Sequence, residues 1–388
     1  MKPISTTIAA ALAGMLATGP GHAGPDEKSQ TELDALRARV EALEAERAKE
    51  AETAEDPFTF SFRNGTTVGI YGYIKGDLIY DDDANLGTTT FGLKNLAPGA
   101  PSNDNFQGHA KQTRLGVDIS NGAFDAKIEG DFFGGTPGTD EYRLRHAYGE
   151  YKGLLVGQSW SNFGPLFSYP ATLDFQGPAG MPFARVMQAR YTYDTGNGFS
   201  FSAAIEEDKN GNATEPSYTA AAKYDFDRGA IRLAGISRDI TDNLGNDIDG
   251  WGVSLAGTAE LWQGGSILGN YHVGDGLADH LVFALGTGVA NPNALFFGAD
   301  EVEAESATVG ISQQINEKWT LSANYGLTEL DRAPALATKE LQSVHVTALY
   351  SPRESLTFGL EYFYGENKLG NGTTAEADRL QFSTRFDF

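Results

Sequence analysis

The last eleven residues, Asp378-Arg-Leu-Gln-Phe-Ser-Thr-Arg-Phe-Asp-Phe388, alternate between two kinds of side chain. From Leu380 to Phe388 every second side chain is apolar or small, and the positions between them are charged or polar. Successive side chains of a β-strand point to opposite faces, so this segment predicts a strand with one apolar and one charged face. The chain ends on the aromatic residue that completes the apolar face.

The composition agrees with a protein built from many strands. The 388 residues include 47 Gly, 23 Phe and 16 Tyr, which favours short strands and turns over helices. A terminal strand that ends on Phe is typical of bacterial outer-membrane β-barrels, where Phe388 would be the signal read by the barrel assembly machinery. The absence of cysteine is weakly consistent with export through an oxidising compartment. The net charge of -23 argues against a nucleic-acid partner.

The N-terminus reads as an export signal over residues 1–23. Lys2 supplies a positive start, an apolar run follows from Ile8 to Ala17, and Gly21-His22-Ala23 forms a small-x-small cleavage site. This run is about half the ~20 residues that a membrane-spanning helix needs, and no later run is longer. Any insertion into a membrane must therefore be through a barrel.

Residues 24–56 predict a short periplasmic coiled coil. Between Ser29 and Glu55 there is no Gly, Pro or aromatic residue, and apolar side chains recur with heptad spacing. An Arg-apolar-x-x-apolar-Glu pattern, associated with parallel trimers, overlaps the heptads. The residues expected to form the trimeric coil are Leu33, Leu36, Arg39, Val40, Leu43 and Glu44. Because two apolar heptads are marginal in isolation, a solitary solvated helix is the alternative.

A two-residue period runs from Pro57 to the end of the chain. Tight turns alternate with long connections, which is the arrangement of an even-stranded membrane barrel with both termini at the periplasmic rim. A soluble sandwich gives the same local pattern, but charges in mid-strand and aromatic residues near strand ends favour a water-filled lumen inside a lipid-facing wall. We therefore predict an all-β fold, a 16-stranded antiparallel transmembrane β-barrel over 57–388, with 14 or 18 strands as alternatives. The expected strands are 67–80, 110–120, 123–133, 142–151, 154–161, 184–194, 199–206, 217–225, 230–239, 249–261, 266–275, 303–313, 318–328, 340–350, 356–366 and 378–388.

Barrels of 16 to 18 strands enclose an aqueous channel, so the strand number predicts a porin. The run Tyr142-Arg-Leu-Arg-His-Ala-Tyr-Gly-Glu-Tyr151, followed by Gly157-Gln-Ser-Trp-Ser161, resembles the DcaP-like trimeric porins of Gram-negative bacteria, as do Arg114-Leu-Gly-Val-Asp118 and Glu129-Gly-Asp-Phe-Phe133. The resemblance implies an outer-membrane homotrimer with a periplasmic coil and a preference for small anions such as dicarboxylates. The chain lacks the acid-rich Pro-Glu-Phe-Gly-Gly type of constriction loop found in general enterobacterial porins.

The selectivity of such a channel should depend on side chains that point into the lumen. Strand phase places Lys75, Arg114, Lys127 and Arg190 inward. Arg143 and Arg145 join them, although the phase of their strand is ambiguous. The third long loop, 162–182, has the single acid Asp174; if it folds into the lumen, the constriction is positive and guanidinium groups can bind carboxylates. The alternative is that lumen acids neutralise the basic residues and leave a weakly cation-selective, general-diffusion pore. These acids are Asp77, Asp118, Glu129 and Asp131.

The sequence offers little for catalysis. His146, His272 and His345 lie on separate strands, and 157–161 misses the Gly-x-Ser-x-Gly pattern at its last position. We expect no enzyme activity, no cofactor and no metal site. The expected partners are other copies of the chain, outer-membrane lipid, lipopolysaccharide and small anionic solutes. An envelope tether that acts through the coiled coil is the alternative from another functional class.

Overall fold

The computed structural model describes residues 58–99, 103–136, 138–208, 213, 215–241, 247–281, 295–297 and 300–388. The predicted signal peptide and the predicted coiled coil lie outside these ranges. Among the described residues, no helix has the length and apolar character needed to cross a membrane.

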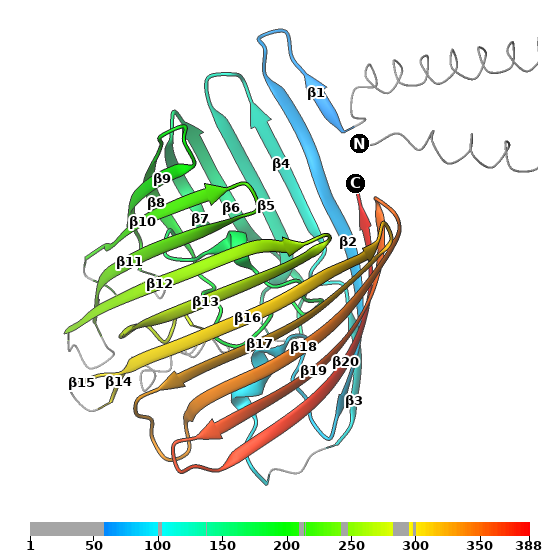
Figure 1. Cartoon of the computed structure of the whole chain (residues 1–388), viewed down its shortest axis with the longest axis vertical. Coiled ribbons are helices and arrows are strands. Elements are labelled where there is room, and N and C mark those ends of the chain that lie inside the picture. Colours follow the sequence, from blue (N-terminus) through cyan, green and yellow to red (C-terminus); the bar gives the residue numbers. More distant parts are fainter. Residues whose placement is uncertain are drawn as a thin grey trace, which may run out of the picture. The chain divides into compact units, whose positions relative to one another are not determined.

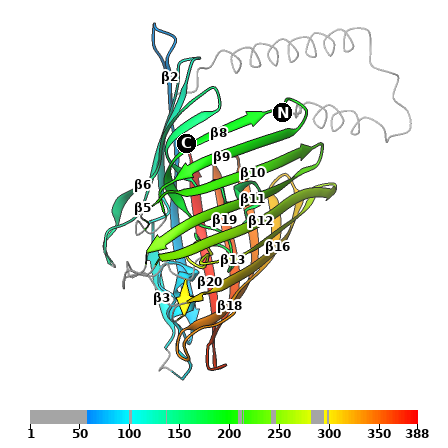
Figure 2. The same ribbon diagram turned by 90° about the vertical axis from the view of Figure 1, so that its left-hand side faces the viewer.

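In the described part of the chain, sixteen antiparallel strands form a closed barrel, and Figures 1 and 2 show them following one another round a cylinder. The ring closes where β2 pairs with β20 from Tyr73 opposite Asp387 to Asp82 opposite Asp378. The barrel strands are β2 (Thr67–Asp82), β4 (Arg114–Ser120), β5 (Asp125–Gly134), β6 (Glu141–Tyr151), β7 (Leu154–Trp160), β8 (Arg185–Asp194), β9 (Phe199–Glu206), β10 (Ser217–Phe226), β11 (Gly229–Thr241), β12 (Asp247–Trp262), β13 (Gly265–Asp275), β16 (Glu303–Asn316), β17 (Trp319–Leu330), β18 (Thr338–Arg353), β19 (Leu356–Leu369) and β20 (Thr374–Asp387).

Four shorter strands and two short 3₁₀ helices complete the described elements. β1 (Thr59–Ser61) pairs with β2 just beyond the end of β20, so it covers an edge that the C-terminus leaves unpaired. β3 (Asn105–His109) pairs with residues 77–81 of β2, and β4 pairs with residues 67–73 of the same strand. The two strands therefore form one side of β2, separated by residues 110–113. The others are β14 (Phe296–Phe297), β15 (Asp300–Glu301), η1 (Thr90–Asn95) and η2 (Leu166–Ser168).

The predicted fold class is confirmed, and each predicted segment corresponds to one barrel strand. The predicted boundaries differ from the observed ones by up to four residues. The largest differences lie near the seam: the segment expected at 110–120 is β4, which begins at Arg114, with β3 as a separate strand before it, and the last strand begins at Thr374 rather than 378. The predicted alternation is also present, since Ile74 and Leu78 of β2 are exposed on the outside while Lys75 and Asp77 are buried inside.

Tight turns join the strands at one end of the barrel and long segments join them at the other. Lys152 and Gly153, which make up the turn between β6 and β7, both have positive φ angles, of 49° and 83°. Segments at the other end, including 84–96, 161–184 and 277–281, fold into the barrel. They bury an apolar cluster inside the cylinder, which includes Leu86, Leu93, Phe163, Leu277 and Leu281. The core of the barrel therefore forms where these loops pack against the inner face of the wall.

Candidate functional site

The segment between β7 and β8 crosses the interior and is fixed to the opposite wall. It leaves the wall where Ser161 Oγ donates to Glu206 Oε2 at 2.7 Å. It then makes one polar contact after another with the far strands. These contacts are Ser168 with Asn270 on β13, Ala171 with Ser322 on β17, Leu173 with Glu361 on β19, Ala179 with Ser343 on β18, and Gly180 with Ser306 on β16. This constriction loop, residues 161–184, therefore narrows the lumen.

Glu361 is the strongest anchor of the constriction loop. Its carboxylate accepts hydrogen bonds from the backbone N–H of Leu173 at 2.7 Å and of Asp174 at 3.3 Å. Thr347 Oγ1 donates to the same carboxylate at 2.7 Å, and His345 Nδ1 lies 3.1 Å from it. Because Glu361 is buried and its oxygens bond to loop backbone, the loop position is tied to one charged side chain of the wall.

A cluster of arginine side chains lies on the wall that the loop leaves open. Arg143 makes a two-point contact with Asp131, with Nε to Oδ1 at 3.0 Å and Nη2 to Oδ2 at 2.8 Å. Arg145 bridges Asp131 at 2.8 Å and Glu129 at 2.9 Å. Arg114 Nε lies 3.4 Å from Glu129 Oε1, and this nitrogen is buried without a hydrogen-bond partner.

A β-bulge explains why the phase of β6 is ambiguous in the sequence. Opposite β6, Glu129 pairs with His146 and the next residue, Gly130, pairs with Leu144, so Arg145 is the extra residue. Both Arg145 and His146 are buried on the inside. The bulge shifts the alternation by one residue. Odd-numbered residues face inward up to Arg145, and even-numbered residues such as Tyr148 face inward after it.

Two further arginines reach this region that the sequence did not single out. Arg185, the first residue of β8, lies over the ring of Trp160 at 4.8 Å and that of Phe183 at 5.7 Å. The odd-numbered residues of β8 face outward, as Met187 and Ala189 do. The alternation therefore predicts that Arg185 also faces outward, so it could not identify this residue as one of the lumen. Arg385 lies 4.2 Å from the Tyr73 ring and pairs with Asp387, and its inward phase could have been read from the final strand.

Aromatic rings from the loop and the wall separate these guanidinium groups. Phe175 contacts both Arg143 and Arg145, at 5.7 Å and 5.5 Å, and Trp160 contacts Arg145 and Arg185. Such cation–π contacts hold a guanidinium by its face, so its N–H edges stay available to other partners. The constriction is thus an array of alternating cations and rings.

The passage beside this array is a cavity of about 330 Å³. Its lining includes Arg114, Arg145 and Arg385 from the wall and Tyr169 and Phe175 from the loop. Burial raises the pKa of the Tyr169 phenol above its usual range, so that side chain stays uncharged at neutral pH.

The charges around this passage do not cancel. Four guanidinium groups, those of Arg114, Arg143, Arg145 and Arg185, gather around the two carboxylates of Glu129 and Asp131. Asp174 and Arg385 also line the cavity, and Arg385 pairs with Asp387, so five guanidinium groups stand against four carboxylates and leave an excess of one positive charge. The narrow region therefore offers a surplus of hydrogen-bond donors and positive charge to a passing solute.

Of the remaining predicted lumen residues, Asp174 lines the same cavity as the array, whereas Lys75 and Asp77 lie beneath the loop. Lys75 pairs with Asp77 at 2.9 Å and donates to the Leu173 carbonyl, so the loop covers both. Asp174 is buried, where it accepts from Thr90 and lies 3.6 Å from Arg379.

Two of the predicted basic residues lie on other parts of the inner wall. Lys127 pairs with the half-exposed Asp118 at 3.0 Å and lies over the Tyr71 ring. Arg190 is partly buried and lies opposite Leu155 of β7. The lumen residues therefore divide into the arginine array and a set that packs beneath or beside the loop.

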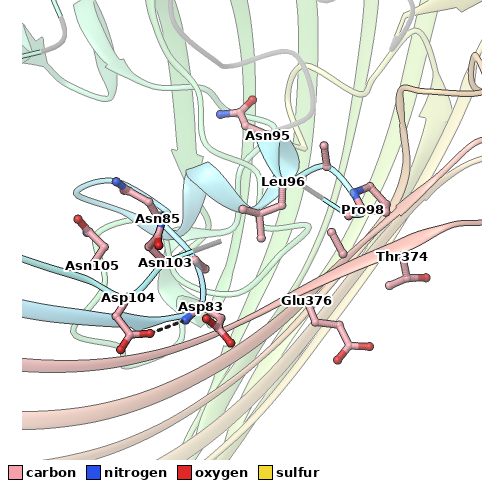
Figure 3. A pocket seen from close by; sticks show the side chains of 14 residues that line it. Asp83, Asn85, Asn95, Leu96, Pro98, Asn103, Asp104, Asn105, Thr374 and Glu376 are labelled. Atoms are coloured by element: carbon pink, nitrogen blue, oxygen red, sulfur yellow. Dashed lines mark hydrogen bonds between the residues drawn. The ribbon is translucent and has the colours of Figure 1, made fainter. Parts of the chain in front are cut away.

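A second cavity lies at the long-loop end of the barrel, and its lining is polar and acidic. It measures about 650 Å³ and is lined by residues 83–85, 95–99, 103–105 and 374–376. Figure 3 shows its amide and carboxylate side chains, with the backbone N–H of Asp83 donating to Asp104 at 3.2 Å. Its described lining includes acids such as Glu376 and no basic side chain. Positive charge is therefore a property of the constriction rather than of the mouth.

The comparison with family models decides the identity of the fold. Residues 30–388 match the model of the DcaP outer membrane protein. The chain belongs to the DcaP outer membrane protein family. The closed barrel with its apolar outer face is thereby identified as that of an outer-membrane protein.

Solved structures show the same barrel fold. The outer membrane channel DcaP of Acinetobacter baumannii superposes with a TM-score of 0.73 at 24% identity, covering 85% of this chain and 99% of that one. OmpT of Vibrio cholerae gives 0.58 at 15% identity, with 84% and 98% covered. An anion-selective porin from Comamonas acidovorans gives 0.58 at 12%, with 83% and 100% covered. A comparison with curated protein sequences gives no match.

Proposed function

We propose that this outer-membrane channel favours small hydrophilic anions, including dicarboxylates, which diffuse through it down their gradients. The observation that carries the proposal is the excess of guanidinium groups over carboxylates at the constriction. Arg114 and Arg185 each have a buried nitrogen without a hydrogen-bond partner. A carboxylate entering the passage would satisfy such donors, while a cation would meet a surplus of like charge.

The test is the reversal potential of the refolded protein in a planar bilayer that separates two KCl concentrations. An anion-selective pore gives a potential of the sign set by chloride. The sign set by potassium contradicts the proposal. Addition of succinate to one side at constant ionic strength then measures whether dicarboxylates enter, through the reduction in chloride current that their occupancy causes.

A weakly cation-selective, general-diffusion pore is the second candidate. It is favoured by the contacts of Glu129 and Asp131 with Arg143 and Arg145, which neutralise part of the array, and by the acidic mouth shown in Figure 3. The same potential measurement separates the two candidates. Charges at a wide mouth are screened over about 8 Å at physiological salt, so the narrow region should dominate.

The proposal extends to the two ends of the chain. Residues 1–23 direct export and are removed, residues 24–56 form a periplasmic coil that joins three copies, and residues 57–388 form the barrel. The trimer is held in part by the heptad residues from Leu33 to Glu44. The assembly machinery reads Phe388, and the outer wall contacts lipid and lipopolysaccharide.

A further inference from the structure

The constriction loop contains a single charged residue, Asp174. This residue lines the cavity of about 330 Å³ together with Arg114, Arg145 and Arg385. The ring of the next residue, Phe175, lies 5.5 Å from the Arg145 guanidinium. The Asp174 carboxylate is therefore one residue away from the array, where a free negative charge would cancel part of the positive surplus.

Both oxygens of the Asp174 carboxylate are occupied by donors that lie outside the array. Oδ1 accepts from Thr90 Oγ1 at 2.8 Å and from the backbone N–H of Gln176 at 2.9 Å. Oδ2 accepts from the backbone N–H of Thr90 at 3.0 Å. Asp174 is only 3% exposed, so it presents little of its charge to the lumen. Thr90 supplies two of the three hydrogen bonds and is the main clamp on this acid.

Arg379 of β20 offsets the charge of the clamped carboxylate. Its Nη1 lies 3.6 Å from Asp174 Oδ2 and has no hydrogen-bond partner in the described part of the chain. Its Nε and Nη2 are held by Asp81 at 2.6 Å and 3.0 Å, which fixes the guanidinium in place. One buried cation thus stands beside Asp174 on the side of the seam.

The segment that carries Thr90 is itself fastened to the wall. Thr90 is the first residue of η1, which lies inside the barrel. Thr338 Oγ1 on β18 donates to the Lys94 carbonyl at 3.1 Å, and Asn367 Nδ2 on β19 donates to the Leu96 carbonyl at 2.9 Å. Thr90 lies outside the described lining of the passage, so a solute there does not touch it. Any effect of Thr90 on the passage must therefore act through Asp174 or the loop.

We propose that Thr90 is a positioning residue for ion selectivity, because it holds the carboxylate of Asp174 out of the passage. The inference rests on the proposed anion preference and names a residue that maintains it. With the clamp in place, the loop contributes aromatic rings to the passage and withholds its only acid. Without the clamp, the carboxylate can turn towards Arg145 and Arg114 and reduce the positive surplus.

Two substitutions remove the clamp in steps. Thr90→Val removes the hydroxyl that donates to Asp174 and keeps the shape of the side chain. Thr90→Pro removes the hydroxyl and the backbone N–H together. Proline is suited to the first position of a helix. The preceding residue, Thr89, has a φ of -147° and a ψ of 163°, the extended conformation that a following proline requires.

A double-mutant cycle on ion selectivity tests the proposal. Thr90→Pro should lower the ratio of chloride to potassium permeability by up to about fivefold, the effect of one unit charge at about 4 Å in water. Thr90→Val should give a smaller shift in the same direction. In an Asp174→Asn background there is no charge to release, so neither substitution should change the ratio. The reversal potential of the refolded proteins in a KCl gradient is the measurement.

Thr89→Val is the matched control. Thr89 is the neighbouring threonine and caps η1 by accepting from the backbone N–H of Phe91 at 3.4 Å, but its hydroxyl does not bond to Asp174. This variant loosens the same segment and should leave the permeability ratio unchanged. Heat-modifiable migration in electrophoresis confirms that each variant has formed its barrel.

The outcomes separate this inference from the proposed function. Equal shifts from Thr90→Pro with and without Asp174→Asn would show that the substitution acts through the shape of the loop, which overturns the inference. An unchanged ratio in a folded Thr90→Pro barrel overturns it as well. A preference of the unmodified protein for potassium contradicts the proposed anion selectivity alone. The role of Thr90 is then still decided by whether its replacement moves the ratio further towards potassium.

Discussion

The guanidinium of Arg185 lies 4.8 Å from the centre of the Trp160 ring, and within the described part of the chain no carboxylate pairs with it. Its neighbours Arg143 and Arg145 are each held by carboxylates at 2.8 to 3.0 Å. Arg185 therefore contributes a charge that is not neutralised locally. Among the arginines of the array, it should have the largest effect on which ions pass.

Replacement of this residue, Arg185→Gln, should lower the ratio of chloride to potassium permeability about fivefold. One unit charge at about 4 Å in a watery pore is worth about 1 kcal/mol, which corresponds to that factor. The reversal potential in a KCl gradient measures it. Arg353→Gln, which removes the same charge from an exposed position at the end of β18, should leave the ratio unchanged. An equal effect of both variants would refute a local role for Arg185.

The opposite change is expected for Asp131→Asn. Two arginines lose the negative charge that neutralises them, so chloride permeability relative to potassium should rise by a similar factor. Asn keeps one acceptor oxygen, so thermal stability should fall by less than the roughly 3 to 5 kcal/mol typical of breaking a buried pair. Asp125→Asn, at an exposed position on the same strand, is the control. An unchanged ratio for Asp131→Asn would mean that the array does not set selectivity.

Loss of the loop anchor should alter the pore without altering its charge preference. In Glu361→Gln only one oxygen remains to accept from the backbone of Leu173 and Asp174, which costs about 1 to 3 kcal/mol of loop attachment. Single-channel records should show larger and noisier conductance than the unmodified protein. Glu354→Gln, in the exposed turn between β18 and β19, should behave normally. A quiet Glu361→Gln channel of unchanged size would show that other contacts hold the loop.

Deletion of residues 24–56 should weaken the trimer but leave the barrel folded. The coil is predicted to join three copies, whereas the barrel contains its own core. Trimer dissociation during heating in mild detergent is the measurement, and it should occur at a lower temperature. An unchanged trimer, combined with loss of attachment to the cell wall, would favour the envelope tether instead.

Removal of Phe388 should reduce the amount of assembled barrel in the outer membrane. The N–H and carbonyl of this residue each pair with Gly72 at 3.1 Å, and its ring lies 5.8 Å from that of Phe58. We expect a several-fold loss, measured as heat-modifiable protein in isolated outer membranes. Phe386→Ala, which removes another outward ring from β20, should have a smaller effect. Equal losses would indicate a general requirement for apolar area.

The strands were predictable because one physical signal repeats along them. Lipid on one side and water on the other force an alternation such as Ile74, Lys75, Gly76, Asp77 and Leu78, and that alternation needs no tertiary information. The alternation did not predict which face a residue occupies where the backbone departs from regular pairing. The bulge at Arg145 and the start of β8 at Arg185 each break the period, so the phase of the first was ambiguous and the second was missed.

The path of the constriction loop across the lumen has only a weak signal in the sequence. Its composition, with one acid at Asp174, is compatible with entry into the lumen, yet its anchors are single residues on distant strands. Glu361, Ser343 and Ser306 each look like ordinary inward positions until the loop is laid against them. Pairing of groups more than a hundred residues apart leaves no local pattern in a sequence.

The seam between β2 and β20 joins the first and the last strand of the barrel. Arg379 Nε donates to Asp81 Oδ1 at 2.6 Å across that seam, and the two residues are 298 positions apart. The cylinder cannot shut until translation and export of the whole polypeptide have finished. A product truncated by a premature stop codon would present the unpaired edge of β2 to the periplasm, where proteases and aggregation remove such chains. Because β20 closes the ring against β2, only chains that contain this strand can complete the barrel.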